Sequence, residues 1–309
     1  DALLDSLHER MGEERMFRPG IASDAAPLAW GRAIGVTGKR DAGQAGIYGS
    51  KGPDYDYRVY ALQTGVDLYR RQAPSGSIDR AGTYVAFGRA SADVTHADGR
   101  DAGDAQLDGL SLGGYWTHIG KDGWYTDAII QGTKYHVDNA RSPSGFDVRT
   151  RGHGLGASLE GGYPFRLNDE WVIEPQAQLS YQKINLNDAN DGVARVRFSD
   201  VDSLRGRVGV RVARMVELDS SGQNRRVATT WLRASLVNEF LANPATAFSS
   251  QGGEVPFRAD MRGLSAQFNL GADVGVKRNV SLYGSVGSEV SLRGEGHSLN
   301  GKFGVKIAF

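Results

Sequence analysis

Ser111 is the residue that most resembles a catalytic nucleophile, because it stands in the sequence Gly109-Leu110-Ser111-Leu112-Gly113. In serine hydrolases this spacing places the serine on a sharp turn between a strand and a helix, where its hydroxyl is exposed. Here the five residues lie within a stretch that alternates between the two faces of a β-strand. We therefore do not expect an enzyme activity from this motif.

Histidine is the other residue type that could catalyse a reaction or bind a metal. The chain has no cysteine, and none of its six histidines forms a close pair at the spacing of a metal site. We predict neither a metal nor a cofactor. A catalytic alternative stays open, because three histidines near predicted loop ends have acidic residues close by in the sequence; these are His96, His136 and His297.

Charged residues that alternate with apolar ones form the largest group with possible chemistry. Successive side chains of a strand point to opposite faces, so each such segment has a charged face and an apolar face. We expect the charged faces to line one lumen, either as an ion-pair network that keeps a water-filled pore neutral or as a wall that holds a helix or guides a moving polypeptide. The residues concerned are Glu160, Glu174, Glu239, Asp273, Arg205, Arg207, Arg211 and Arg233.

Twelve alternating segments follow one another, near 28–37, 57–71, 81–95, 106–118, 123–137, 147–164, 171–186, 194–214, 227–240, 258–276, 280–292 and 298–309. They run about 10 to 20 residues, whereas strands of soluble proteins usually run about 5 to 6. Aromatic residues gather near their ends, as at a membrane interface, namely Trp30, Tyr69, Trp116, Trp124, Tyr163, Trp171, Tyr181 and Trp231. We therefore predict an all-β membrane protein, a twelve-stranded antiparallel transmembrane β-barrel, in preference to a soluble sandwich.

The last segment carries the clearest alternation. Its apolar parity ends on the terminal aromatic residue, and we interpret four of its residues as an assembly signal: Phe303, Val305, Ile307 and Phe309. Lys302 and Lys306 fall on the opposite parity. An apolar face of this kind suits lipid, and a lysine face suits a wet lumen.

Residues 1–16 are the one predicted helix, because apolar residues repeat at helical spacing at Leu3, Leu4, Leu7 and Met11. Such a helix is about 24 Å long, close to the ~25 Å height of the lipid band of a barrel. We place it in the pore. The predicted domains are then 1–20, helix and linker, and 21–309, the barrel.

Composition fits this interpretation. Lys plus Arg and Asp plus Glu both total 36, so no net charge would attract nucleic acid. The chain is only 40% hydrophobic and its mean hydropathy is -0.40. A membrane barrel tolerates such values because only every second strand residue faces lipid.

The chain resembles the translocator domain of classical, monomeric autotransporters over nearly its whole length. The residues that carry the resemblance are the helix followed by Ala29-Trp30-Gly31-Arg32, then Gly113-Gly114-Tyr115, the segment 154–160, Glu174-Pro175-Gln176, Asn238-Glu239-Phe240 and the terminal Phe309. The resemblance implies a monomeric barrel in the outer membrane of a Gram-negative bacterium, with the helix threaded through its pore. It also implies export of an N-terminal passenger by type V secretion. The implied partners are that passenger, the barrel-assembly machinery, periplasmic chaperones and outer-membrane lipid.

Two other functions stay open at this point, a free-standing porin-like channel and an outer-membrane barrel hydrolase. Passenger release is also open. Some members of the family cut the passenger inside the barrel with an asparagine of the helix and an acidic wall residue. Residues 1–16 contain no asparagine, so that mechanism does not carry over, and Glu160 and Glu174 are only candidates for its acidic partner.

Overall fold

The computed structural model describes residues 3–4, 7–11, 28–41, 53–96, 98–141, 147–190, 195–219, 226–243, 245–250, 253–258, 260–277 and 279–309. Within these residues it contains seventeen strands and one helix, α1 (Leu7–Met11). No helix in these ranges is long and apolar enough to cross a membrane.

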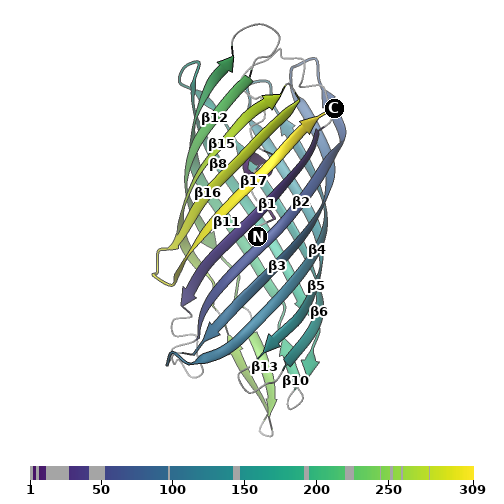
Figure 1. The fold of residues 1–309 in the computed structure, drawn as a ribbon, viewed down its shortest axis with the longest axis vertical. Helices are drawn as coiled ribbons and strands as arrows, with labels where there is room; N and C mark the ends of the chain where they lie inside the picture. The colour runs from purple at the N-terminus through teal and green to yellow at the C-terminus, as the bar shows by residue number, and fades with distance from the viewer. Residues whose placement is uncertain are drawn as a thin grey trace.

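Twelve long strands form a closed antiparallel barrel (Figure 1). They are β1 (Leu28–Asp41), β2 (Asp54–Gln72), β3 (Ile78–Thr95), β4 (Asp101–Ile119), β5 (Tyr125–Arg141), β6 (Asp147–Gly162), β8 (Trp171–Leu186), β11 (Val201–Asp219), β12 (Arg226–Glu239), β15 (Gly263–Lys277), β16 (Val280–Ser291) and β17 (Gly296–Ala308). Neighbours along the chain pair with each other, β8 pairs with β11, and β17 pairs with β1. The prediction of a twelve-stranded barrel is confirmed.

The two ends of the barrel differ. Leu28 pairs with Ala308, so the first and last strands share one end, which we call the terminal end. Short hairpins at residues 73–77 and 120–124 lie at this end as well. The connections between β6 and β8, β11 and β12, and β15 and β16 lie there too. The other end, which we call the loop end, carries the connections that follow β1, β3, β5, β8, β12 and β16. Figure 1 shows β10 and β13 projecting beyond it, away from the C-terminus.

A second, four-stranded sheet stands at the loop end. It consists of β9 (Ala189–Asn190), β10 (Arg195–Phe198), β13 (Ala245–Ser250) and β14 (Gly253–Arg258), and β7 (Phe165–Arg166) is a short addition to the edge of β8. The predicted segments 194–214 and 258–276 begin too early for this reason. Their first residues alternate like the barrel strands, but the chain leaves and re-enters the barrel there.

Side chains alternate between lipid and lumen as expected. On β12, Leu232 and Leu236 point outward and are about half exposed, whereas Arg233 between them is 2% exposed. At the C-terminus Leu299, Phe303, Ile307 and Phe309 likewise point outward and are 41–66% exposed. One face of each strand therefore suits lipid and the other face fills the barrel.

The predicted membrane-interface girdle is wrong at two positions. Trp30 and Trp231 are buried inside the barrel, while Trp116 and Trp171 are exposed on its outside. The physical reason is parity, because Trp231 stands two residues from Arg233 on the inward face. Glycine on the next strand makes room for the ring: a Cβ atom added to Gly271 would lie 2.3 Å from Trp231.

Aromatic rings packed over glycines yield a test of how tightly the lumen is filled. A Cβ atom at Gly113 would lie 2.2 Å from the ring of Tyr84, which is buried and donates a hydrogen bond of 2.8 Å to Gln131. We expect Gly113→Ala to reduce the free energy of unfolding by about 1–3 kcal/mol, as overpacking typically does. The measurement is the temperature at which the purified barrel loses its compact, heat-modifiable gel mobility.

Gly132→Ala is the matched control, since nothing lies within 4 Å of a Cβ atom added there. Equal unfolding temperatures for the two variants would contradict the tight packing of Tyr84 on Gly113.

Candidate functional site

The site is the lumen around α1, and an apolar cluster holds one side of the helix. Leu7 is fully buried, and Leu4, just before the helix, is 4% exposed. Both belong to a cluster with aromatic side chains of the wall, among them Trp30, Tyr84 and Tyr125. The helix prediction covered residues 1–16. Of these, 7–11 are helical, Leu3 and Leu4 form a turn, and the others lie outside the described residues.

Three consecutive polar residues of α1 reach three different parts of the wall. His8 lies 2.9 Å from Glu174 on β8. Arg10 donates a hydrogen bond of 2.6 Å to Asp127 on β5. Successive side chains of an α-helix point about 100° apart, so neighbours in sequence face separate strands.

Glu9, between them, is the most heavily bonded residue of the helix. Its carboxylate accepts hydrogen bonds from Arg233 on β12 at 2.6 Å and from Lys302 on β17 at 2.8 Å. All three side chains are nearly inaccessible to solvent. Through Glu9, the helix is therefore bonded to both β12 and β17.

The wall also binds the backbone of the helix. Arg32 donates a hydrogen bond of 2.9 Å to the carbonyl oxygen of Glu9, and the Tyr283 hydroxyl donates one of 2.6 Å to that of Arg10. The last four carbonyls of any helix lack partners within it. In a helix of five residues these groups dominate, and wall side chains satisfy some of them.

All eight residues predicted for the charged wall point into the barrel. Glu160 lies 3.3 Å from Arg207, and Arg211 lies 4.0 Å from Glu174. Arg233 binds Glu9, as above. The buried positions are Glu160, Glu174, Asp273, Arg207, Arg211 and Arg233.

Two predicted wall residues lie apart from the helix. Arg205 forms a double hydrogen bond with Glu289. Glu239 accepts hydrogen bonds from the Ser203 hydroxyl and from the backbone amide of Ala242, so it orders the chain where β12 ends. These two residues stabilise the loop half of the lumen.

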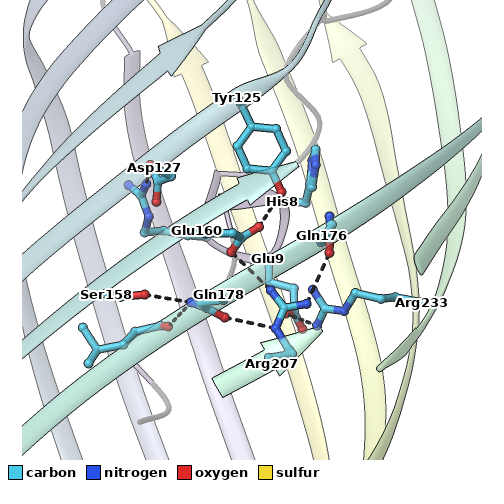
Figure 2. Close-up of polar contacts among 12 residues, drawn as sticks. His8, Glu9, Tyr125, Asp127, Ser158, Glu160, Gln176, Gln178, Arg207 and Arg233 are labelled. Carbon is cyan, nitrogen blue, oxygen red and sulfur yellow. Dashed lines mark hydrogen bonds and ion pairs between the residues drawn. The ribbon is translucent and has the colours of Figure 1, made fainter. Parts of the chain in front are cut away.

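Neutral polar groups connect the charges of the wall. Tyr125 donates a short hydrogen bond to Glu160, and Arg207 donates to Gln178 at 3.1 Å and to Gln176 at 3.2 Å. Figure 2 shows these side chains converging beneath α1 from β5, β6, β8 and β11. The result is one hydrogen-bonded layer across the lumen.

Sequence reasoning missed several residues of this site. It singled out the apolar side of the helix, Leu3, Leu4, Leu7 and Met11, and not its polar residues. It also missed Asp127 and Arg32 on the wall. Parity with the inward residues Tyr125 and Trp30 would have placed both in the lumen, but nothing in the sequence shows which helix residue they bind.

The motifs that suggested chemistry are structural. Ser111 is buried within β4 and hydrogen-bonds the Thr133 hydroxyl at 2.8 Å, so no exposed nucleophile results. The three histidines considered for catalysis, His96, His136 and His297, are all exposed. In the described ranges, no group of three or more His, Cys, Asp or Glu residues could hold a metal ion.

A cavity of about 590 Å³ occupies the loop half of the lumen. Leu4 and Glu9 line it on the helix side, and Tyr57 and Arg262 line it nearer the loop end. Hydrogen bonds from Arg262 lower the pKa of Asp260 to about 2, so that this carboxylate stays ionised and neutralises Arg262 at the rim. The lumen thus has a filled part around the helix and an emptier part beside it.

A family model described as Autotransporter beta-domain matches residues 29–287. The pertactin autotransporter of Bordetella bronchiseptica is 29% identical over 286 residues, which cover 91% of this chain and 28% of that protein. The uncharacterized protein YdeU of Escherichia coli is 26% identical over 98% of this chain and 65% of its own length. This chain therefore spans about a quarter of the length of pertactin.

Two solved structures share the fold. The transport unit of the autotransporter AIDA-I from Escherichia coli has a TM-score of 0.75 at 15% identity, and covers 96% of this chain and 94% of its own. The β-domain of the Bordetella autotransporter BrkA has a TM-score of 0.71 at 22% identity, and covers 92% of this chain and all of its own.

The bonds of Glu9 predict a measurable effect on the helix. Glu9→Gln deprives Arg233 and Lys302 of the carboxylate between them, and breaking such a buried ion pair costs roughly 3–5 kcal/mol. We expect faster hydrogen exchange of residues 7–11 and a higher single-channel conductance in planar bilayers.

The control is Glu289→Gln, which removes a carboxylate from the same lumen at a position bonded to Arg205 instead of to the helix. If Glu289→Gln changed exchange at residues 7–11 as much as Glu9→Gln, the bonds of Glu9 would not be what holds α1.

Proposed function

The chain belongs to the autotransporter β-domain family, and from this premise we propose that it is the translocator of a larger type V secretion protein. It lies in the outer membrane of a Gram-negative bacterium. There the barrel, residues 21–309, anchors an N-terminal passenger and helps to export it to the cell surface. Residues 1–20 serve as the helix and linker that thread the pore.

The direction of the chain inside the lumen is the observation that best supports export. Leu4 lines the cavity in the loop half of the lumen. Arg10 binds Asp127, which stands two residues from the start of β5 at the terminal end. The chain therefore runs from the loop half toward the terminal end, so any polypeptide attached before residue 1 is led toward the loop end. We assign the loop end to the cell exterior and the terminal end to the periplasm.

The charged wall has a role in this proposal. Its residues hold the helix in the pore after export, through bonds from Glu174 and Arg233 to α1. The polar and charged lining of the loop-half cavity gives a moving polypeptide alternative hydrogen-bond partners. The wall thus holds the helix in the pore and also gives the moving polypeptide a hydrated, polar surface.

A free-standing channel fits the lumen less well. Such a channel needs an open bore, whereas α1 is bonded to β5, β8, β12 and β17 across it. The family is one of translocator barrels, and we propose that this barrel has no catalytic activity of its own.

Membership of the family implies an attached passenger as the first partner. We propose that the barrel-assembly machinery and periplasmic chaperones are the others, and that the barrel is a monomer. Its outward residues, such as Leu112, Leu232 and Phe303, are exposed and apolar all around the barrel and thus suit contact with lipid.

The proposed function predicts a gene product much larger than this chain. We expect mass determination and N-terminal sequencing of the outer-membrane and secreted fractions to find a large polypeptide that is attached, or was attached, before residue 1. A product consisting of a signal peptide followed directly by this chain would refute export of a passenger and leave a channel or a barrel enzyme.

The proposed assembly signal predicts a defect in insertion. Phe309 is 66% exposed on the same outward face as Phe303 and Ile307, where insertion factors can reach it. We expect Phe309→Ser to reduce the amount of folded, heat-modifiable barrel in the outer membrane several-fold.

Phe240→Ser is the control, because Phe240 is equally apolar and 50% exposed but lies at the loop end. Wild-type abundance of the Phe309→Ser barrel, or an equal loss with Phe240→Ser, would argue against a signal at the terminus.

A further inference from the structure

Four basic side chains form a compact block on the outer surface of β5 and β6. Lys134 pairs directly with His153, and His136 pairs directly with Arg151. All four are exposed. Directly opposed residues of antiparallel strands have Cβ atoms about 4.5–5.5 Å apart, and alternate residues share a face. We propose that this basic block binds the phosphate groups of an outer-leaflet membrane lipid.

The block lies where the lipid-facing surface ends. Along β5 the outward face changes from Ile130, 58% exposed, to Lys134 and His136. Along β6 it changes from Leu155, 53% exposed, to His153 and Arg151. Both changes occur toward the loop end. With the loop end outside the cell, as the proposed function has it, this is the depth of the headgroups of the outer leaflet.

Two acidic groups lie near the histidines of the block, and each is bonded to a cation outside it. Asp200, near His153, forms an ion pair of 2.8 Å with Lys183. Asp108 pairs with His136 across β4 and β5, but its two oxygens accept hydrogen bonds of 2.7 and 2.8 Å from Arg89. Over the described ranges of the chain, Lys134 and Arg151 form no ion pair. A bound phosphate would pair with Lys134 and Arg151 and accept hydrogen bonds from the histidines.

Exposed cations of other strands near the loop end have different surroundings. Lys39 forms an ion pair of 3.1 Å with Asp56, and Arg89 forms one of 2.7 Å with Asp108. The block differs from them in bringing Lys134, Arg151 and two histidines together on two paired strands.

Apolar residues of β5 and β6 continue from the block toward the terminal end. Ile130 on β5 and Leu155 and Leu159 on β6 are 53–58% exposed on the outward face. A phosphorylated glycolipid would place its phosphates on the block and lay its acyl chains along these residues.

The test is binding of lipid A, the bisphosphorylated glycolipid of this leaflet, to the full-length protein in detergent, followed by native mass spectrometry. The variant is Lys134→Gln/Arg151→Gln. Each lysine or arginine near an anionic surface contributes roughly a factor of five in affinity, so we expect binding to weaken roughly 30-fold. Lys121→Gln/Arg226→Gln, which removes two exposed cations at the terminal end, should bind as the wild type does.

Three results would overturn the proposal. They are unchanged affinity of the folded Lys134→Gln/Arg151→Gln variant, equal binding of dephosphorylated lipid A by the wild type, and complete displacement of lipid A by millimolar inorganic phosphate, which would make the ligand a free anion. If the variant does not fold, the wild-type protein provides the test. Its affinity for lipid A should fall steeply as the salt concentration is raised, and an affinity independent of salt would overturn the proposal. The measurement needs no secretion, so its failure would leave the proposed export function standing.

Discussion

Hydrocarbon offers no hydrogen-bond partners, so every backbone group of this chain within the bilayer has to be paired inside the protein. Closure of the sheet through the β8–β11 and β17–β1 pairs meets that requirement. Closure also gives every strand one face toward lipid and one face toward the lumen. The inward charged residues of twelve strands are then enclosed with one another, and their pairing decides what fills the barrel.

The barrel could be predicted because its signal is repeated and local. A period of two persists over each long segment, as in Leu232, Arg233, Ala234, Ser235 and Leu236, and the lipid boundary forbids exceptions on the outer face. The same alternation between lumen and lipid would have corrected the predicted membrane-interface girdle of aromatic residues. Trp231 shares its parity with Arg233, and Trp30 shares its parity with Arg32, so both rings belonged inside. The loop-end sheet was missed because its strands alternate just as the barrel strands do.

The partners within the lumen could not be predicted, because they depend on how α1 is rotated and how deeply it is inserted. Parity gives each wall residue a face, and the structure places all eight predicted charges on the inward one. It does not say that Glu174 meets His8 or that Arg233 meets Glu9. Those pairs join residues 166 and 224 positions apart. Helical spacing likewise selected Leu4 and Leu7 but gave no reason to attend to the charges between them.

The order of the charged residues explains how so short a helix keeps one rotation and one depth of insertion in the lumen. His8 faces an acidic group, Glu9 faces Arg233 and Lys302, and Arg10 faces Asp127. Turning the helix by one residue would bring Glu9 to Glu174 and Arg10 to Arg233, and like charges in a poorly solvated space repel strongly. Buried ion pairs add little net stability, yet a mismatched one costs several kcal/mol, so they specify position better than they stabilise. Apolar contacts of Leu4 and Leu7 would tolerate several rotations, whereas the alternating charges allow one.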